Sequence, residues 1–277
     1  GRCCAGRASA TSPLSCRPIG ASGGCSIRPA VTAEATPPGP DGRPRVDRAP
    51  TGRIVAALLP ACVVPFLASL IYFVAFAGES WARWVYVLVK IFTLVWPVVA
   101  TVWILGRRLP RVDWRAPRHR RALVAGALFG GAVVVAVFAL LRTPVGDQIA
   151  AFAPQIRAKV EQLGVLEHYA AFALFLSFAH SALEEYYWRW FVFGRLREVV
   201  SRRLALPIAA LAFASHHAVV VGQYVSLPWA ILGTAAVAFA GGVWCWMYER
   251  QRTLTGAWIS HVLADLVVLW VGYRMLF

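Results

Sequence analysis

Two adjacent glutamates and an arginine interrupt an otherwise apolar stretch of the chain. Glu184, Glu185 and Arg189 lie in the sequence HSALEEYYWRW, directly after the run YAAFALFLSFA. Charged groups inside an apolar helix are costly, so they normally face a partner, a cavity or a substrate. A carboxylate held away from bulk water is suited to act as a general base on a water molecule. The stretch therefore predicts a catalytic carboxylate.

Other ionisable residues fall inside the same apolar stretch and two later ones. These residues are His180, His216, His217, His261 and Asp265. At a rise of about 1.5 Å per residue, Glu184, His217 and His261 lie roughly 12 to 20 Å from the expected helix ends. Three helices that each place an ionisable group at similar depth predict one shared polar layer.

The spacing of these residues predicts which of them act together. Residues four apart share a helix face, as do Glu185 and Arg189, which we interpret as an internal ion pair that supports the site. Glu184 then has no obvious charge partner, and we assign it as the general base. For His180, four residues before Glu184, a role in orienting that carboxylate is an alternative.

The histidines of the later stretches supply the remaining chemistry. His217, in the same layer as Glu184, is expected to help hold the attacking water, whereas His216 should point to another side of its helix and pack there. His261 is expected to stabilise the oxyanion of a tetrahedral intermediate. Asp265, four residues later, either assists as a neutral donor or fixes the tautomer of His261.

The composition is that of a membrane protein. Of 277 residues, 59% are hydrophobic and 15% are charged, and the mean hydropathy is +0.60, a balance that soluble domains of this size do not normally show. The net charge is +15, but the arginines cluster between apolar runs, as is typical of membrane-flanking segments. We therefore expect contact with a lipid bilayer and no nucleic-acid partner.

Apolar runs of about the length needed to cross a bilayer recur along the chain. They lie near 54–77, 82–105, 122–141, 168–193, 204–222, 228–248 and 254–275. The fold class is therefore predicted as an all-α, polytopic transmembrane bundle of about seven spans. The charged stretch 147–168 is expected to form an amphipathic helix on the membrane surface.

Arginine-rich connections predict the orientation of the bundle. The segment 106–121 carries seven arginines, and more follow within 189–203 and 249–252, whereas the alternate connections carry few. Under the positive-inside rule the arginine-rich side is cytoplasmic. We therefore expect a multi-pass protein of the cell membrane with its amino terminus in the cytoplasm.

The chain divides into a leader and a membrane domain. Residues 1–50 are rich in Gly, Pro, Ser and Arg and lack hydrophobic periodicity, so they are predicted to be disordered. The multi-span domain is assigned to 51–277, and its motif-bearing core to 168–270. The six cysteines show no spacing typical of a disulfide framework or a zinc site.

Three short motifs resemble those of one protease family. EEYYWR matches EExxxR, FASHH matches FxxxH through Phe213 and His217, and HVLAD matches HxxxN/D. Their order and spacing resemble the CPBP family, which comprises CAAX prenyl proteases and bacteriocin-processing enzymes, also called Abi proteins. Asp265 stands where many members have asparagine.

This resemblance implies a glutamate-dependent intramembrane endopeptidase acting on a membrane-associated or C-terminally tagged protein or peptide. Glu184 and His217 would activate water, and His261 and Asp265 would form the oxyanion site. The chain ends after the seventh run, where eukaryotic prenyl proteases continue into an eighth helix, which favours a substrate other than a CAAX protein.

Two alternatives remain open at this level. Glu184, His217 and His261 would also make a His₂Glu zinc set with a free position for water, but the sequence has no HExxH motif, and we favour chemistry without a cofactor. The second alternative is a non-catalytic membrane scaffold or transporter component that binds ions or partners in the polar layer. The oligomeric state is left open.

Overall fold

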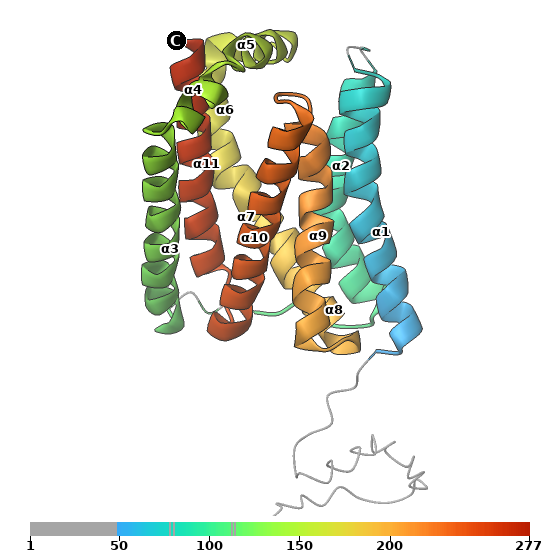
Figure 1. Ribbon diagram of the computed structural model, residues 1–277. Helices are drawn as coiled ribbons and strands as arrows, with labels where there is room; N and C mark the ends of the chain where they lie inside the picture. Colours follow the sequence, from blue (N-terminus) through green and yellow to red (C-terminus); the bar gives the residue numbers. More distant parts are fainter. Residues whose placement is uncertain (1–48, 78, 80, 112, 114) are drawn as a thin grey trace, which may run out of the picture. The chain divides into compact units, whose positions relative to one another are not determined.

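The computed structural model describes residues 49–77, 79, 81–111, 113 and 115–277. The leader predicted for residues 1–50 lies outside this part except for its last two residues. Contacts divide the chain into Gly1–Asp47 and Arg48–Phe277, and only the second unit contains described residues. Within it, all regular structure is helical, as predicted (Figure 1).

Among the residues that the structure describes, six helices are long and apolar enough to cross a membrane. They are α1 (Thr51–Leu70) with its continuation η1 (Ile71–Ala75), α2 (Ala82–Val99) with η2 (Ala100–Ile104), α3 (Arg118–Leu141), α9 (Arg202–Val221), α10 (Leu227–Gln251) and α11 (Thr255–Leu276). All six correspond to predicted runs. The chain is therefore a multi-pass membrane protein.

The remaining predicted run, 168–193, belongs to a long helix of mixed character. Its segments are α6 (Tyr169–Phe175), η4 (Leu176–His180), α7 (Ser181–Glu184), η5 (Glu185–Phe193) and α8 (Gly194–Val199). Leu166–Val199 qualifies as a span only together with Pro144–Gln162, from which it is bent by 96°. The charged residues of the motif lower its hydropathy, and they are the reason that this helix differs from the other six.

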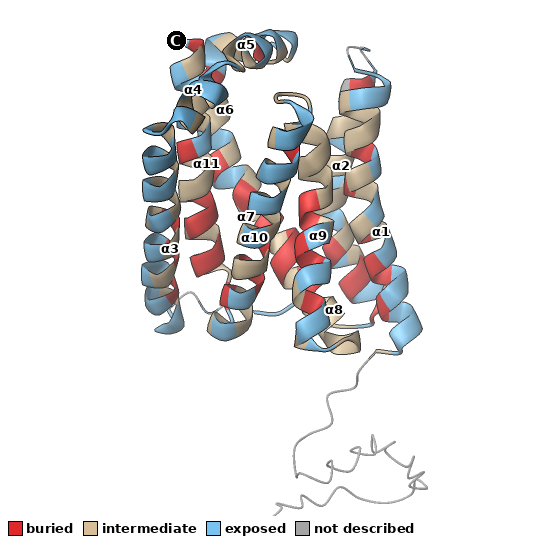
Figure 2. Cartoon of the chain, in the orientation of Figure 1, coloured by how far each residue is buried: buried red, intermediate tan, exposed pale blue. Residues whose placement is uncertain are grey.

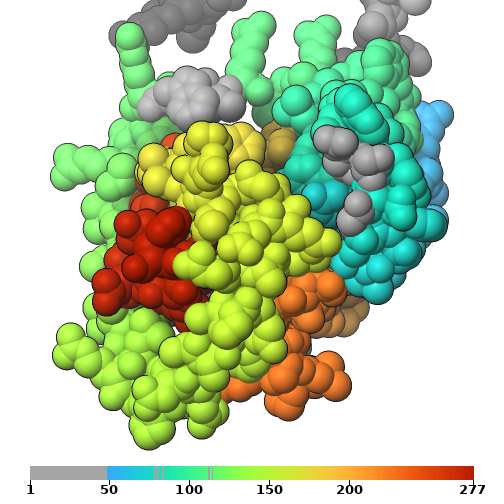
Figure 3. Space-filling view, turned by 90° about the horizontal axis from the view of Figure 1, so that it is seen from above, coloured from blue at the N-terminus to red at the C-terminus, as the bar shows by residue number. Residues whose placement is uncertain are grey.

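The predicted surface helix 147–168 is two short helices rather than one. α4 (Pro144–Ala150) and α5 (Ala153–Gln162) are separated by a turn, and the short η3 (Leu166–His168) follows. Val160 of α5 and Leu276 of α11 pack in one apolar cluster. Figure 3 shows the red C-terminal end of α11 beside the lime-green residues of this segment.

The arginine-rich connections meet at one end of the bundle. Arg107 Nη2 lies 2.8 Å from Glu198 Oε2, and Arg197 Nε lies 2.8 Å from Glu249 Oε1. The hydrogen bond from Arg107 to Glu198 raises the pKa of this guanidinium. The start of α1 is at the same end, and the C-terminus is at the opposite end (Figure 1).

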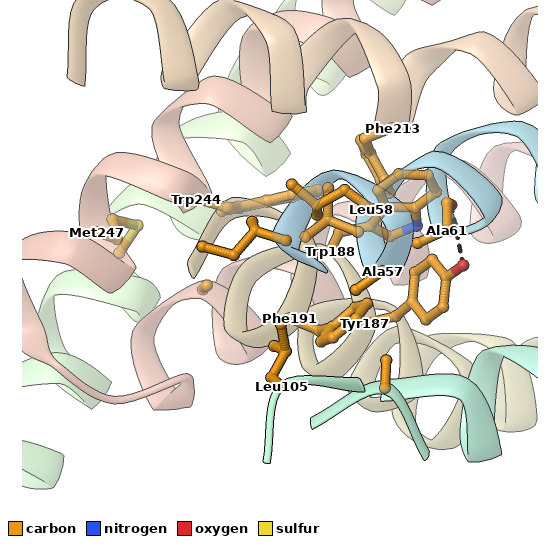
Figure 4. Close-up of a cluster of buried hydrophobic side chains, with 14 residues drawn as sticks. Ala57, Leu58, Ala61, Leu105, Tyr187, Trp188, Phe191, Phe213, Trp244 and Met247 are labelled. Carbon is orange, nitrogen blue, oxygen red and sulfur yellow. Dashed lines mark hydrogen bonds between the residues drawn. The ribbon is translucent and has the colours of Figure 1, made fainter. Parts of the chain in front are cut away.

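The core lies where α1, α2, η5, α9 and α10 meet. Tyr187 and Phe191 of η5 are fully buried there, and the Tyr187 hydroxyl donates to the Ala61 carbonyl of α1 at 2.9 Å (Figure 4). Large apolar side chains are exposed on the outer faces, for example on α3 (Figure 2). Because these faces are apolar and unpacked, they are suited to contact lipid chains.

Small residues allow α3 and α11 to pack closely. A Cβ atom at Gly126 of α3 would lie 2.4 Å from the Gly256 carbonyl oxygen of α11, and one at Gly130 would lie 2.7 Å from the Leu263 side chain. Glycines at such contacts let helix backbones approach each other in membranes. This packing fixes α11, which carries His261 and Asp265.

Candidate active site

Glu184 is the centre of the polar layer. Its carboxylate is nearly buried, with 8% of the side chain exposed, and it contacts imidazoles of three helical segments. Oε1 lies 3.2 Å from His180 Nε2 and 3.4 Å from His216 Nε2, while Oε2 lies 3.7 Å from His261 Nε2. Far from lacking partners, as the sequence suggested, this carboxylate is surrounded by imidazole nitrogens.

The backbone changes its helical form at the motif. Glu184 is the last residue of α7, and Glu185 is the first residue of η5, a nine-residue π-helical segment. Such segments are rare and are frequent at functional sites. Glu184 and Glu185 face different neighbours here: the first faces the histidines described above, and the second is fully buried beside Arg189.

Glu185 and Arg189 form the predicted ion pair, and the pair includes a third residue. Glu185 Oε1 lies 3.1 Å from Arg189 Nη1 and 2.8 Å from His261 Nδ1. The Arg189 guanidinium lies 4.2 Å from the ring centre of Phe213 and 4.9 Å from that of Trp244. Cation–π contacts with both rings stabilise a desolvated cation. The neighbours of this buried charge therefore lie on η5, α9 and α10 and, through Glu185, on α11.

His217 has a defined orientation and a free nitrogen. Its Nδ1 donates to the Phe213 carbonyl one turn earlier, at 3.1 Å. A carbonyl oxygen only accepts, so the proton of the neutral ring is on Nδ1 and Nε2 carries a lone pair. His217 can therefore accept a proton from water or bind a metal through Nε2.

His261 stands between three carboxylates. Besides the Glu185 and Glu184 contacts, its Nε2 lies 3.6 Å from Asp265 Oδ1. The side chain of Asp265 is 29% exposed, whereas that of His261 is 4% exposed. Asp265 therefore marks the accessible side of the polar layer.

The structure brings together all six residues assigned from the sequence, and it adds two. His216, which was expected to point away, contacts Glu184 while its ring stacks on Trp188 at 5.5 Å between centres. The expected direction was wrong because His216 Nε2 lies 3.4 Å from Glu184 Oε1, and the ring centres of His216 and His217 are only 4.2 Å apart.

Lys90 is the second addition. It lies in α2, and its Nζ is 3.4 Å from His180 Nδ1. A lysine in the middle of the run 82–105 was a visible signal, because cationic residues are rare within spans. Its role depends on a contact with His180 of another helix, and spacing within α2 does not reveal that contact.

The metal-ligand geometry differs from the predicted zinc set. Among the described residues, Glu184, His216 and His217 offer ligand atoms within 4.8 Å of one another, with His216 in place of His261. The bond from His217 Nδ1 to a backbone carbonyl is the outer-shell contact that metal-binding histidines commonly make. The three donors therefore fit a zinc ion, which would polarise a bound water molecule.

A buried carboxylate, several imidazoles and a partly accessible acid lie together inside a helical membrane bundle, an arrangement that is chemically able to activate water. Residues 166–267 match the family model described as type II CAAX prenyl endopeptidase Rce1-like. This match covers 102 of the 277 residues and confirms the resemblance to the CPBP family over that part. It supports an intramembrane endopeptidase. Searches of curated proteins and of solved structures gave no match.

The buried pair makes a stability prediction. Arg189→Met leaves the Glu185 carboxylate buried with only His261, and we expect a loss of about 3–5 kcal/mol in the free energy of unfolding. The double variant Glu185→Gln/Arg189→Met removes both charges and should recover a large part of this loss. Unfolding of the detergent-solubilised protein measures both values.

Arg203→Met provides the matched control. Arg203 is exposed at the start of α9, so the same substitution should change the stability there by no more than about 0.5 kcal/mol. Equal stability of Arg189→Met and Arg203→Met would contradict the structural role of the pair.

Proposed function

We propose that this endopeptidase hydrolyses a peptide bond with a water molecule activated by Glu184 and His217. The observation that carries the proposal is the position of Glu184: a carboxylate with 8% of its side chain exposed, facing imidazoles from two other helices. Its Oε1 lies 3.2 Å and 3.4 Å from the Nε2 atoms of two histidines. If both nitrogens donate, Oε2 is the oxygen left to accept a proton. His217 Nε2 provides a second acceptor for the same water molecule.

The reaction balances without a cofactor. The water oxygen attacks the carbonyl carbon while its proton passes to Glu184, and the carbonyl oxygen becomes an oxyanion. The tetrahedral intermediate then collapses, the C–N bond breaks, and Glu184 returns the proton to the leaving amine. The products are a carboxylic acid and an amine, and transfer of the remaining water proton between them gives a carboxylate and an ammonium group.

His261 and Asp265 are proposed as the oxyanion site. Because His261 Nδ1 faces Glu185 at 2.8 Å, its Nε2 can donate only when the ring carries both protons. The carboxylates of Glu185 and Asp265 favour this charged form. An imidazolium with one N–H held by Glu185 and the other directed at the substrate is a strong donor for a developing negative charge.

The proposed substrates are membrane-associated or C-terminally tagged proteins or peptides. The polar layer lies within the spanning helices, so the scissile bond must reach it from the membrane or its surface. The enzyme class implies a peptide partner. Mass spectrometry of membrane and secreted proteins with and without this enzyme would identify the processed chain.

Removing the base should abolish cleavage. For Glu184→Gln and His217→Ala we expect losses of about 10²- to 10⁴-fold in the rate of cleavage, with unchanged insertion and folding. The assay uses an internally quenched, farnesylated CAAX peptide and, in parallel, the processed protein found by mass spectrometry. Each change removes a proton acceptor and keeps the helix.

Glu161→Gln and His168→Ala are the controls for these variants. Both residues are exposed and lie outside the polar layer, so both variants should cleave at the wild-type rate. Cleavage by Glu184→Gln at the rate of Glu161→Gln would show that the proposed base is wrong.

A zinc peptidase is the second candidate, and the cluster of Glu184, His216 and His217 is the observation that favours it. Under the favoured metal-free mechanism, activity should persist after treatment with a strong zinc chelator. Elemental analysis should then find no stoichiometric zinc in the wild type. Loss of activity on chelation with recovery by zinc, together with zinc that His216→Ala lacks, would establish the second candidate.

We also propose that the protein lies in the cell membrane with the arginine-rich end of the bundle in the cytoplasm. In a background without other cysteines, Ser226→Cys should react with a membrane-impermeant maleimide in intact cells, because this exposed residue lies at the arginine-poor end. Arg108→Cys, exposed at the other end, should react only after permeabilisation. The reverse labelling pattern would invert the orientation.

A further inference from the structure

Lys90 is a cation inside a membrane span that has no carboxylate partner within ion-pair distance among the described residues. Its Nζ lies 3.4 Å from His180 Nδ1 and 3.5 Å from His180 Nε2, and 5.1 Å from the ring centre of Tyr86. The imidazole of His180 is therefore its hydrogen-bond acceptor. The same imidazole contacts Glu184 on its other side.

The two contacts together define the protonation of His180. An ammonium group has donors only, so it needs an imidazole nitrogen with a lone pair. An ionised carboxylate has acceptors only, so Glu184 needs an imidazole N–H. Lys90 Nζ lies almost equally close to both ring nitrogens, but His180 Nε2 is the nitrogen at 3.2 Å from Glu184 Oε1. With the proton on Nε2 towards the carboxylate, Nδ1 is the nitrogen left to accept from Lys90.

We propose that Lys90 is a positioning residue that holds His180 as an Nε2–H donor to Glu184. This inference rests on the proposed role of Glu184 as the base and adds a residue from α2 to its support. Without Lys90, His180 can carry its proton on Nδ1 and turn a lone pair towards the carboxylate. The contact with Glu184 Oε1 is then repulsive.

The consequence for catalysis is orientation of the base. His180 and His216 both hold Oε1, at 3.2 Å and 3.4 Å, and so direct Oε2 towards His261. A carboxylate that rotates freely presents either oxygen to water and loses the alignment that the reaction needs. Lys90 therefore acts on the rate through His180 and does not touch the substrate.

The direct test reads the tautomer and needs no substrate. In protein labelled with ¹⁵N-histidine and reconstituted in lipid bilayers, ring ¹⁵N shifts of His180, assigned by comparison with His180→Leu, should show protonated Nε2 and unprotonated Nδ1. In Lys90→Met the Nδ1–H tautomer should gain population. A doubly protonated His180 in the wild type, or no change in Lys90→Met, would overturn the proposal.

Kinetics provide a second readout that a purely structural role would not reproduce. With the quenched farnesylated peptide or the identified substrate, Lys90→Met should lower kcat by about 10- to 100-fold with little change in KM, and Lys90→Arg should restore much of the rate. In a His180→Leu background, Lys90→Met should cause no further loss, because the two residues act as a unit. An additive loss, or an effect on KM alone, would refute the positioning role.

Lys159→Met is the matched control, since Lys159 is the other lysine of the chain and lies in α5 on the surface. It should retain wild-type activity and the wild-type His180 spectrum. The outcomes also separate the two proposals. An inactive Glu184→Gln with a fully active Lys90→Met refutes only the role of Lys90, whereas an active Glu184→Gln refutes the proposed base itself.

Discussion

The buried charge of Arg189 constrains much of this structure. A guanidinium inside a membrane domain persists only with an anionic partner and surroundings that replace water. Glu185 supplies the anion, and the guanidinium also makes cation–π contacts with the rings of Phe213 and Trp244. Even the backbone of α10 makes room: a Cβ at Gly241 would lie 2.9 Å from Phe213 and 3.4 Å from Arg189. One cation thus fixes η5 against α9 and α10.

The same constraint extends to the reacting groups. Glu185 also contacts His261, which connects α11 to the ion pair. The Phe213 carbonyl accepts a hydrogen bond from His217 Nδ1. The residues that support the charge and those assigned to the chemistry therefore share atoms or neighbours. Glu184 directly precedes Glu185 in the chain. The packing of the ion pair therefore also fixes the backbone position of Glu184. Such coupling suits a membrane enzyme, in which a misplaced carboxylate has no bulk water to solvate it.

The sequence predicted the helices and the six assigned residues because their signals are local. Apolar length defines a span, and a spacing of four defines a shared face. Lys90 and His216 depend on which helices are neighbours, and no spacing within α2 or α9 reveals that His180 and Glu184 lie opposite them. The zinc set expected from the sequence contained His261, whereas the structure groups His216 with Glu184 and His217. This difference also depends on how the helices pack. Depth along a helix was predictable, whereas rotation about its axis followed from packing.

The charges of the polar layer bear on how Asp265 works at the last position of the HxxxN/D motif. Glu184, Glu185 and Asp265 contribute three negative charges, and Arg189 and Lys90 contribute two positive ones. A second proton on His261 makes the cluster neutral, which is the state that a site of low dielectric favours. In that state both imidazole nitrogens of His261 donate, and Asp265 can remain ionised while it stabilises the charged ring. An asparagine at this position would instead supply its own N–H to the oxyanion. In the proposed mechanism aspartate therefore does not need to serve as a neutral donor, since the neighbouring imidazole would carry the proton for the oxyanion site.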